Sequence, residues 1–141
     1  MSENTLITRN EIEGHVRGFF EAMDACDLTK VADYFDEGTS WTINAAGLPG
    51  NGTTVGWTEI SRAIVGEVRE TVFEPGDPKA DIHHVLVDGQ RAVVEMTARG
   101  RLRSGGQYEN RYAFVFELDG TKFRNIREYM DSHYVAQNVF V

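Results

Sequence analysis

The stretch YENRYAFVFE at residues 108–117 decides the fold. Its side chains alternate between two kinds along the chain. The aromatic and amide set is Tyr108, Asn110, Tyr112, Phe114 and Phe116, and the mostly charged set between them is Glu109, Arg111, Val115 and Glu117. Successive side chains of a β-strand point to opposite faces of the sheet. The stretch therefore predicts a strand with one aromatic face and one mostly charged face.

The same one-sided alternation extends over the rest of the chain from Ala80 onward. Three turn sequences divide this region into four segments: Asp88-Gly89, Ser104-Gly105-Gly106 and Asp119-Gly120. Each turn contains glycine, which adopts the positive φ of tight hairpin turns without steric cost. We therefore expect four antiparallel strands in a meander.

The first half of the chain carries helical patterns instead. Thr8 and Glu11 have the spacing of a capping box, which predicts a helix start. The apolar stripe of this helix is Ile12, Val16, Phe19, Phe20 and Met23. Asp27 is a suitable N-cap for a short second helix, and the apolar spacing in 60–68 predicts a third.

A short β-prone stretch at 41–43 precedes a glycine-rich segment, 45–56, that predicts a long irregular loop. Helices followed by a meander are typical of an α+β fold. With 141 residues, we expect one domain over 1–141, in which three N-terminal helices pack in a strongly bent, mostly antiparallel sheet.

The composition excludes several classes of partner. Fourteen Lys and Arg against 22 Asp and Glu give a net charge of −8, which disfavours binding to nucleic acid and to anionic membranes. No apolar run approaches the roughly 20 residues of a membrane helix, and Met1–Arg9 lacks the layout of a signal peptide, so we expect a cytoplasmic protein. The single cysteine, Cys26, excludes an internal disulfide and predicts a small buried residue.

Four segments of the sequence resemble a known superfamily. They are the first helix ending in Phe20-Glu21-Ala22-Met23-Asp24-Ala25-Cys26-Asp27-Leu28, residues 31–35, residues 41–44, and the strands closing on Ile126-Arg127-Glu128-Tyr129-Met130-Asp131. This arrangement is similar to the nuclear transport factor 2-like superfamily, in its SnoaL-like and ketosteroid isomerase-like branch. The resemblance implies a cone-shaped fold with a deep, mainly apolar pocket. Members include isomerases, epoxide hydrolases, polyketide cyclases and non-catalytic binding modules, so function depends on the pocket residues.

The family's known mechanisms match this sequence only in part. Where ketosteroid isomerases place a tyrosine donor, an aspartate base and a neutral acid, this chain has Phe19, Ile43 or Asn44, and Tyr112. The limonene-epoxide hydrolases imply roles for Asp131 and Asn44. Their arginine and second aspartate correspond here to Met96 and Ala98.

Asp131 is the candidate catalytic residue. If Arg127, Tyr129 and Asp131 share one face of the last strand, the Asp131 carboxylate points into the pocket, where apolar surroundings would raise its pKa. The alternative is that Asp131 caps the strand end or pairs with Arg127.

Eight further residues are candidates for substrate binding: Asn44, Tyr112, Asn110, Trp41, Met96, Tyr129, Phe19 and His84. His83 and His84 are adjacent, so we expect only one of them to face the pocket. No metal-binding spacing of the histidines occurs, and we expect neither a metal nor an organic cofactor.

Two functions follow as hypotheses. The first is an enzyme that performs acid–base chemistry, such as cyclisation, dehydration, isomerisation or epoxide opening, on a small hydrophobic molecule that carries oxygen. The second is a non-catalytic module that binds such a molecule in the same pocket. A homodimer is expected in either case, because the outer sheet face carries charges of both signs, and such a face can be self-complementary about a twofold axis.

Overall fold

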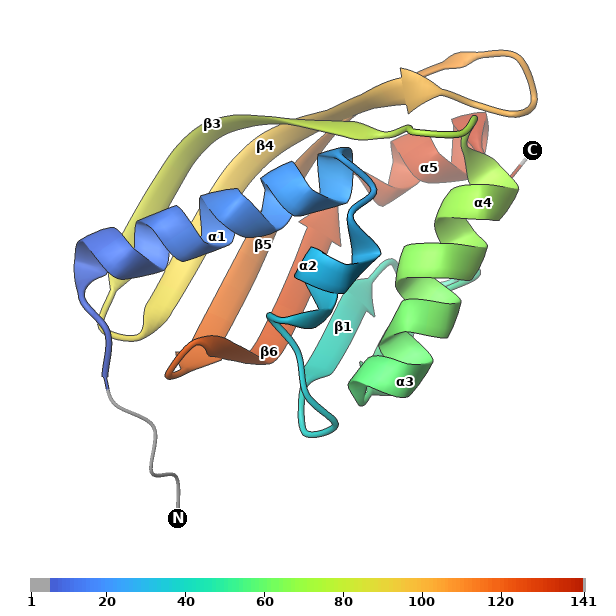
Figure 1. Cartoon of the computed structure of the whole chain (residues 1–141). Helices are drawn as coiled ribbons and strands as arrows, with labels where there is room; N and C mark the ends of the chain where they lie inside the picture. Colours follow the sequence, from blue (N-terminus) through green and yellow to red (C-terminus); the bar gives the residue numbers. More distant parts are fainter. Residues whose placement is uncertain (1–5, 141) are drawn as a thin grey trace.

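The computed structural model describes residues 6–140. Figure 1 shows the helices on one side of a long curled sheet. The helices are α1 (Arg9–Asp24), α2 (Leu28–Ala32), α3 (Trp57–Ile60), the π-helical stretch η1 (Ser61–Val68), α4 (Arg69–Val72) and α5 (Ser132–Asn138). The strands are β1 (Ser40–Asn44), β2 (Gly52–Val55), β3 (Lys79–Asp88), β4 (Arg91–Arg101), β5 (Gln107–Asp119) and β6 (Lys122–Met130).

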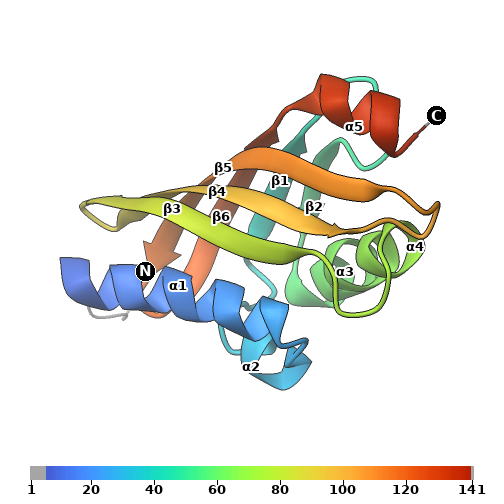
Figure 2. The ribbon, with the colours of Figure 1, turned by 90° about the horizontal axis from the view of Figure 1, so that it is seen from above.

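The six strands form one sheet in the order β2-β1-β6-β5-β4-β3. All neighbours are antiparallel except β1 and β6, which are parallel. The strands β3 to β6 are the expected meander, and Gly89, Gly105 and Gly120 have positive φ in its three turns. The prediction of an α+β fold with a bent, mostly antiparallel sheet is confirmed (Figure 2).

The first helix begins as the sequence predicts. The Thr8 side chain accepts a hydrogen bond from the Glu11 backbone N–H, and the Glu11 side chain accepts one from the Thr8 backbone N–H. The apolar stripe of α1 faces the sheet, and Phe19 lies fully buried among other aromatic rings. The helix thus fills the concave face of the sheet near β3 to β6.

The third predicted helix is a continuous run from α3 through η1 to α4. It stands beside α1 and lies across the mouth of the curled sheet (Figure 1). The eight residues of η1 are π-helical, a geometry that widens a helix locally and is frequent at functional sites.

Three local expectations were wrong. The segment 45–56 is not wholly irregular, because β2 pairs with β1 across it. A helix, α5, follows the last strand. Cys26 is exposed rather than buried, and it lies in the turn after α1 with a positive φ of 56°.

Candidate functional site

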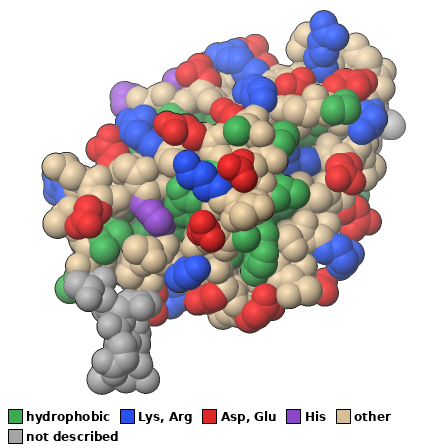
Figure 3. Space-filling model, in the orientation of Figure 1, with side chains coloured by type: hydrophobic (Ala, Val, Ile, Leu, Met, Phe, Trp, Pro, Cys, Tyr) green, Lys and Arg blue, Asp and Glu red, His purple; other side chains and the backbone are tan. Residues whose placement is uncertain are grey.

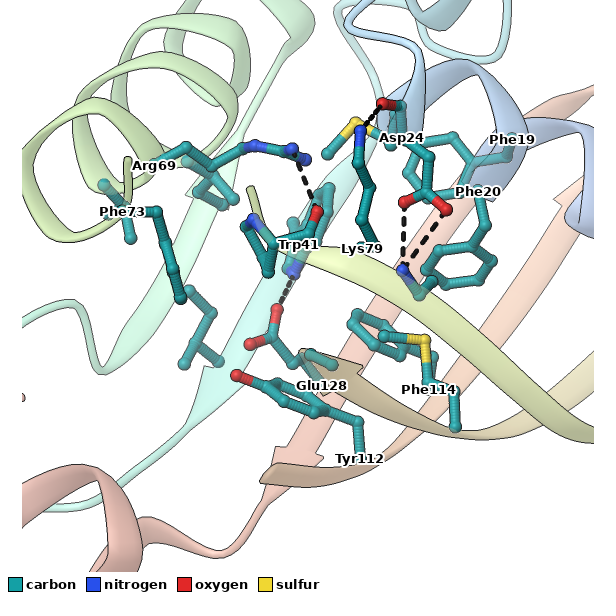
Figure 4. Close-up of a pocket in the computed structure, with 18 residues that line it drawn as sticks. Phe19, Phe20, Asp24, Trp41, Arg69, Phe73, Lys79, Tyr112, Phe114 and Glu128 are labelled. Atoms are coloured by element: carbon teal, nitrogen blue, oxygen red, sulfur yellow. Dashed lines mark hydrogen bonds between the residues drawn. The ribbon is translucent and has the colours of Figure 1, made fainter. Parts of the chain in front are cut away.

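A cavity of about 130 Å³ lies between α1, the α3–α4 helical run and the concave face of the sheet. Its walls are mainly apolar, with Phe20, Met96 and Phe114 among the side chains that line it (Figure 4). From outside, apolar side chains are visible at the centre of the face drawn in Figure 1, with charged side chains of both signs around them (Figure 3). A cavity of this kind suits a small, largely apolar ligand.

Among residues 6–140, Glu128 of β6 is one of two residues with a carboxylate side chain that line this cavity, and Asp24 is the other. The Oε1 atom of Glu128 accepts a hydrogen bond of 3.0 Å from the Nε1–H of Trp41 on β1 (Figure 4). Its Oε2 atom makes no hydrogen bond within residues 6–140. Burial raises the pKa of Glu128 to about 7, an effect that the Trp41 hydrogen bond only partly offsets.

A chain of hydroxyl and amide groups approaches Glu128 from β5. The hydroxyls of Tyr112 and Tyr108 are 2.6 Å apart, and the Nδ2–H of Asn110 donates to the Tyr108 hydroxyl at 3.0 Å. Tyr112 and Glu128 line the same cavity. Burial raises the pKa of Tyr112 well above its ordinary value, so Tyr112 keeps its proton and acts as a neutral hydroxyl.

Charged residues stand at the mouth of the cavity. Both carboxylate oxygens of Asp24 accept from the backbone N–H of Ala80, at 3.0 and 3.2 Å. Lys79 donates to the carbonyl oxygen of Asp24, and Arg69 donates to that of Pro78 (Figure 4). Burial raises the pKa of Asp24, whereas the Ala80 hydrogen bond and the charges of Lys79 and Arg69 act in the opposite direction.

A second cavity of about 90 Å³ lies on the other side of Tyr112 and Glu128. The loop around Leu48 and Pro49 and the end of α5 close it from outside. Tyr112 and Glu128 are therefore common to two apolar spaces.

Four of the residues expected to bind substrate lie at the cavity wall: Trp41, Met96, Phe19 and Tyr112. Their contact with a substrate stays a prediction. Asn110 is buried behind them, where its side chain also donates to the backbone oxygen of Asp131 at 3.2 Å, so it supports Tyr108 rather than the cavity itself.

The expectation that Asp131 points into the pocket was wrong. Asp131 is exposed and forms the N-cap of α5, where its side chain accepts a hydrogen bond from the Tyr134 backbone N–H. Tyr129 points to the outer face and is 43% exposed. The inward residue of this strand segment is Glu128, which the alternation of Arg127, Tyr129 and Asp131 does not indicate.

Asn44 and His84 also lie outside the cavity. Asn44 is exposed at the end of β1, and its amide donates to the backbone oxygen of Glu128 at 3.4 Å. A β-bulge between Ile82 and His84 places both His83 and His84 on the outer face, so neither of them faces the pocket. His83 hydrogen-bonds to the Thr97 hydroxyl there.

Residues 6–140 contain neither a cluster of metal ligands nor a membrane-spanning helix. No group of three or more His, Cys, Asp or Glu side chains is placed to hold a metal ion. No helix in that range has both the length and the apolarity needed to cross a membrane.

Known structures share this fold across nearly the whole chain. An NTF2-like protein from Burkholderia pseudomallei K96243 has a TM-score of 0.82 at 19% sequence identity, covering 92% of this chain and 98% of that one. An NTF2-like protein from Burkholderia xenovorans LB400 has a TM-score of 0.75 at 26% identity, covering 94% and 98%. A protein from Shewanella denitrificans OS-217, described as a SnoaL-like polyketide cyclase, has a TM-score of 0.74 at 15% identity, covering 92% and 96%.

The sequence itself gives the family. No curated protein matches the chain closely enough to count as a relative. The family model of the SnoaL-like domain matches residues 16–126, which include most of the cavity wall. The chain therefore belongs to the SnoaL-like domain family, and its fold is that of the NTF2-like proteins.

Proposed function

We propose that this protein is an enzyme that moves a proton on a small, largely apolar, carbonyl-bearing molecule, with Glu128 as the proton-transfer group. The reaction class is isomerisation or intramolecular cyclisation next to the carbonyl group. Glu128 takes the proton-transfer role that was expected of Asp131.

The placement of Glu128 carries this proposal. The carboxylate stands in a carbon-lined cavity, one oxygen is held by Trp41, and the other has no partner within residues 6–140. A general base works best when its pKa is near the working pH, and burial brings the pKa of Glu128 to about 7. The group can therefore both accept and return a proton near neutral pH.

Tyr112 supplies the second element of the chemistry. When Glu128 removes a proton from the carbon beside a carbonyl, the electron pair moves onto the carbonyl oxygen, and a fixed O–H donor stabilises that oxygen. Tyr112 lines the same cavity and keeps its proton. If Glu128 then returns the proton to another carbon, the net reaction is an isomerisation.

Epoxide opening is less favoured by the cavity. The epoxide-hydrolase relatives need an arginine and a second aspartate at the positions where this chain has Met96 and Ala98. Both of these side chains are buried at the cavity wall and add only carbon and sulfur to it. The site then has no second carboxylate at these positions to activate water.

A non-catalytic binding role is the competing proposal. The predominance of apolar side chains in the wall supports it, since a binding module needs no proton-transfer group. It gives no reason for an ionisable side chain at the inner wall, where an apolar residue would cost less desolvation free energy. The two proposals differ in what removal of the Glu128 carboxylate does.

Proton exchange tests the proposal without knowledge of the natural product. The wild-type protein is incubated in D₂O with a panel of small cyclic and aromatic ketones, and loss of the proton signal beside each carbonyl is followed by NMR. We expect catalysed exchange for at least one ketone, and Glu128→Gln should slow it by about 100-fold or more. Gln keeps an oxygen for the Trp41 hydrogen bond.

The matched control is Glu95→Gln, which changes an exposed glutamate on the outer face of β4. It should leave the exchange rate unchanged. Binding of ketones without any exchange, or equal exchange by wild type and Glu128→Gln, would favour the binding module.

A further inference from the structure

The mouth of the cavity holds two cations, Arg69 on α4 and Lys79 at the start of β3. Both line the cavity, and Figure 4 shows their side chains above Trp41 and Glu128. They come from two different segments, which meet where Arg69 donates to the carbonyl oxygen of Pro78, the residue before Lys79. The chain has a net charge of −8, so two cations together at the entrance to an apolar cavity suggest that they bind a ligand.

Neither cation forms an ion pair with a carboxylate of residues 6–140. Eight ion pairs occur within residues 6–140, and none involves Arg69 or Lys79. The one hydrogen bond of Arg69 goes to the carbonyl oxygen of Pro78, at 3.3 Å, and that of Lys79 goes to the carbonyl oxygen of Asp24, at 2.5 Å. Since a guanidinium has five N–H donors and an ammonium three, most of these donors remain available.

The acidic groups of residues 6–140 that lie nearby form no ion pair with these cations, although the charges of Lys79 and Arg69 act on the Asp24 carboxylate. The Asp24 carboxylate is bound through both oxygens to the Ala80 backbone N–H. Glu70, Glu74 and Asp77 line an adjoining surface hollow together with Arg69, but none of them forms an ion pair with it. The mouth therefore has two cations against the one carboxylate of Asp24, and backbone oxygens hold both cations in place.

The space inside the mouth limits the apolar part of a ligand. Its volume of about 130 Å³ is close to that of an engineered apolar cavity, of about 150 Å³, that binds benzene. One six-membered ring fits such a space, and a fused four-ring skeleton does not. Phe20, Met96 and Phe114 offer the apolar contacts for that ring.

We propose that the cavity binds a molecule made of one apolar ring, which carries the carbonyl group of the proposed reaction, and a short chain ending in a carboxylate, which Arg69 and Lys79 hold at the mouth. This inference rests on the proposed function, because it names the substrate class of the same cavity. A carboxylate is a suitable partner because it can accept hydrogen bonds from both cations at once.

Calorimetric titration with a matched pair of probes tests the inference. The probes are 3-phenylpropanoate and its neutral amide, 3-phenylpropanamide, which have the same ring and chain. The wild type should bind the acid roughly tenfold more tightly than the amide. Arg69→Gln or Lys79→Gln should remove this preference by weakening the acid alone, and Arg69→Lys should retain most of it.

The control is Arg62→Gln, on the same helical run. Arg62 is exposed and pairs with Glu59 and Glu67 instead of lining the cavity, so its loss should change neither affinity. Equal binding of acid and amide by the wild type, an unchanged preference in both Gln variants, or no binding of either probe at millimolar concentration would overturn the inference.

The same titration on Glu128→Gln separates this inference from the proposed function. A preserved preference for the acid in that variant supports the mouth site whether or not the protein is catalytic. A protein that exchanges protons on ketones but shows no preference for the acid would keep the function and lose the mouth site.

Discussion

The two faces of one sheet treat charge in opposite ways. On the outer face, Arg99 pairs with both Asp81 and Glu109, and Arg127 pairs with Glu117. On the inner face, Glu128 has an indole N–H as its hydrogen-bond partner and no cation within ion-pair distance among residues 6–140. Paired charges in water are common on protein surfaces and contribute little stability.

The difference shows that the fold loses stability at Glu128 and not at the paired carboxylates of the outer face. Placing a carboxylate in apolar surroundings without a cation disfavours its ionised form and raises its pKa. The outer carboxylate Glu117 shows the reverse, because its hydrogen bond and ion pair with Arg127 lower its pKa. A group that costs stability without a structural return is a candidate for function.

The largest expected effect concerns the stability cost of Glu128. Its folded-state pKa of about 7 lies above the ordinary value of 4.5, so the folded protein holds a proton that the unfolded chain releases between these values. Stability from this group is therefore lost as the pH rises through about 7. As the pH rises from about 4 to about 8, the free energy of unfolding of Glu128→Gln should increase relative to that of the wild type by at most about 3 kcal/mol.

Urea unfolding of both proteins across that pH range measures this gain. Glu95→Gln, on the outer face, serves as the control and should show no such trend. If the free energy of unfolding of wild type and of Glu128→Gln changed with pH in the same way, the buried carboxylate of Glu128 would not destabilise the folded protein as the pH rises.

A smaller effect is expected from the hydrogen bond that holds Glu128. In the wild type, the hydrogen bond from the Trp41 N–H lowers the pKa of Glu128. Trp41→Phe removes this donor, so the pKa of Glu128 should rise further. The variant should lose about 2 kcal/mol of stability, and more at alkaline than at acidic pH, because the donor favours the ionised carboxylate. The pH dependence of ketone exchange should shift to higher pH. An unchanged pH dependence of ketone exchange would mean that the Trp41 hydrogen bond does not affect the group that transfers the proton.

The smallest effect concerns the outer face, which we propose to be the interface of a homodimer. Arg111 is exposed there and forms no ion pair within residues 6–140, so it is free to meet an acidic residue of a second copy. Sedimentation equilibrium at micromolar concentration should give twice 15.8 kDa. Arg111→Glu should weaken the dimer by roughly tenfold. Arg9→Glu, at the start of α1, should not, and a mass near 15.8 kDa at all concentrations would exclude the dimer.

The sequence predicted the parts of the fold that local signals determine. The capping box of Thr8 and Glu11 and the glycines of the three hairpins act within a few residues, and all of them are present as expected. The helix α5 was missed because Asp131 was interpreted as a pocket residue, although an aspartate after a strand is also a typical N-cap.

The alternation of side chains alone could not predict the site, because two β-bulges change which residues of β3 and β6 face inward. Phe123 pairs with Leu118 and Asn125 pairs with Glu117, which leaves Arg124 unpaired. Counting in twos from the buried Phe123 therefore places Arg127 and Tyr129 inward, whereas the structure turns Glu128 inward. The bulge at His83 misleads in the same way.

The ionisation of Glu128 itself gives the most direct test. The side-chain carboxyl carbon of Glu128, assigned by comparison with Glu128→Gln, can be followed by ¹³C NMR as the pH is varied. The account predicts a titration midpoint of about 7. A midpoint near the ordinary value of 4.5 would contradict it, because Glu128 would then be a solvated carboxylate like those of the outer face.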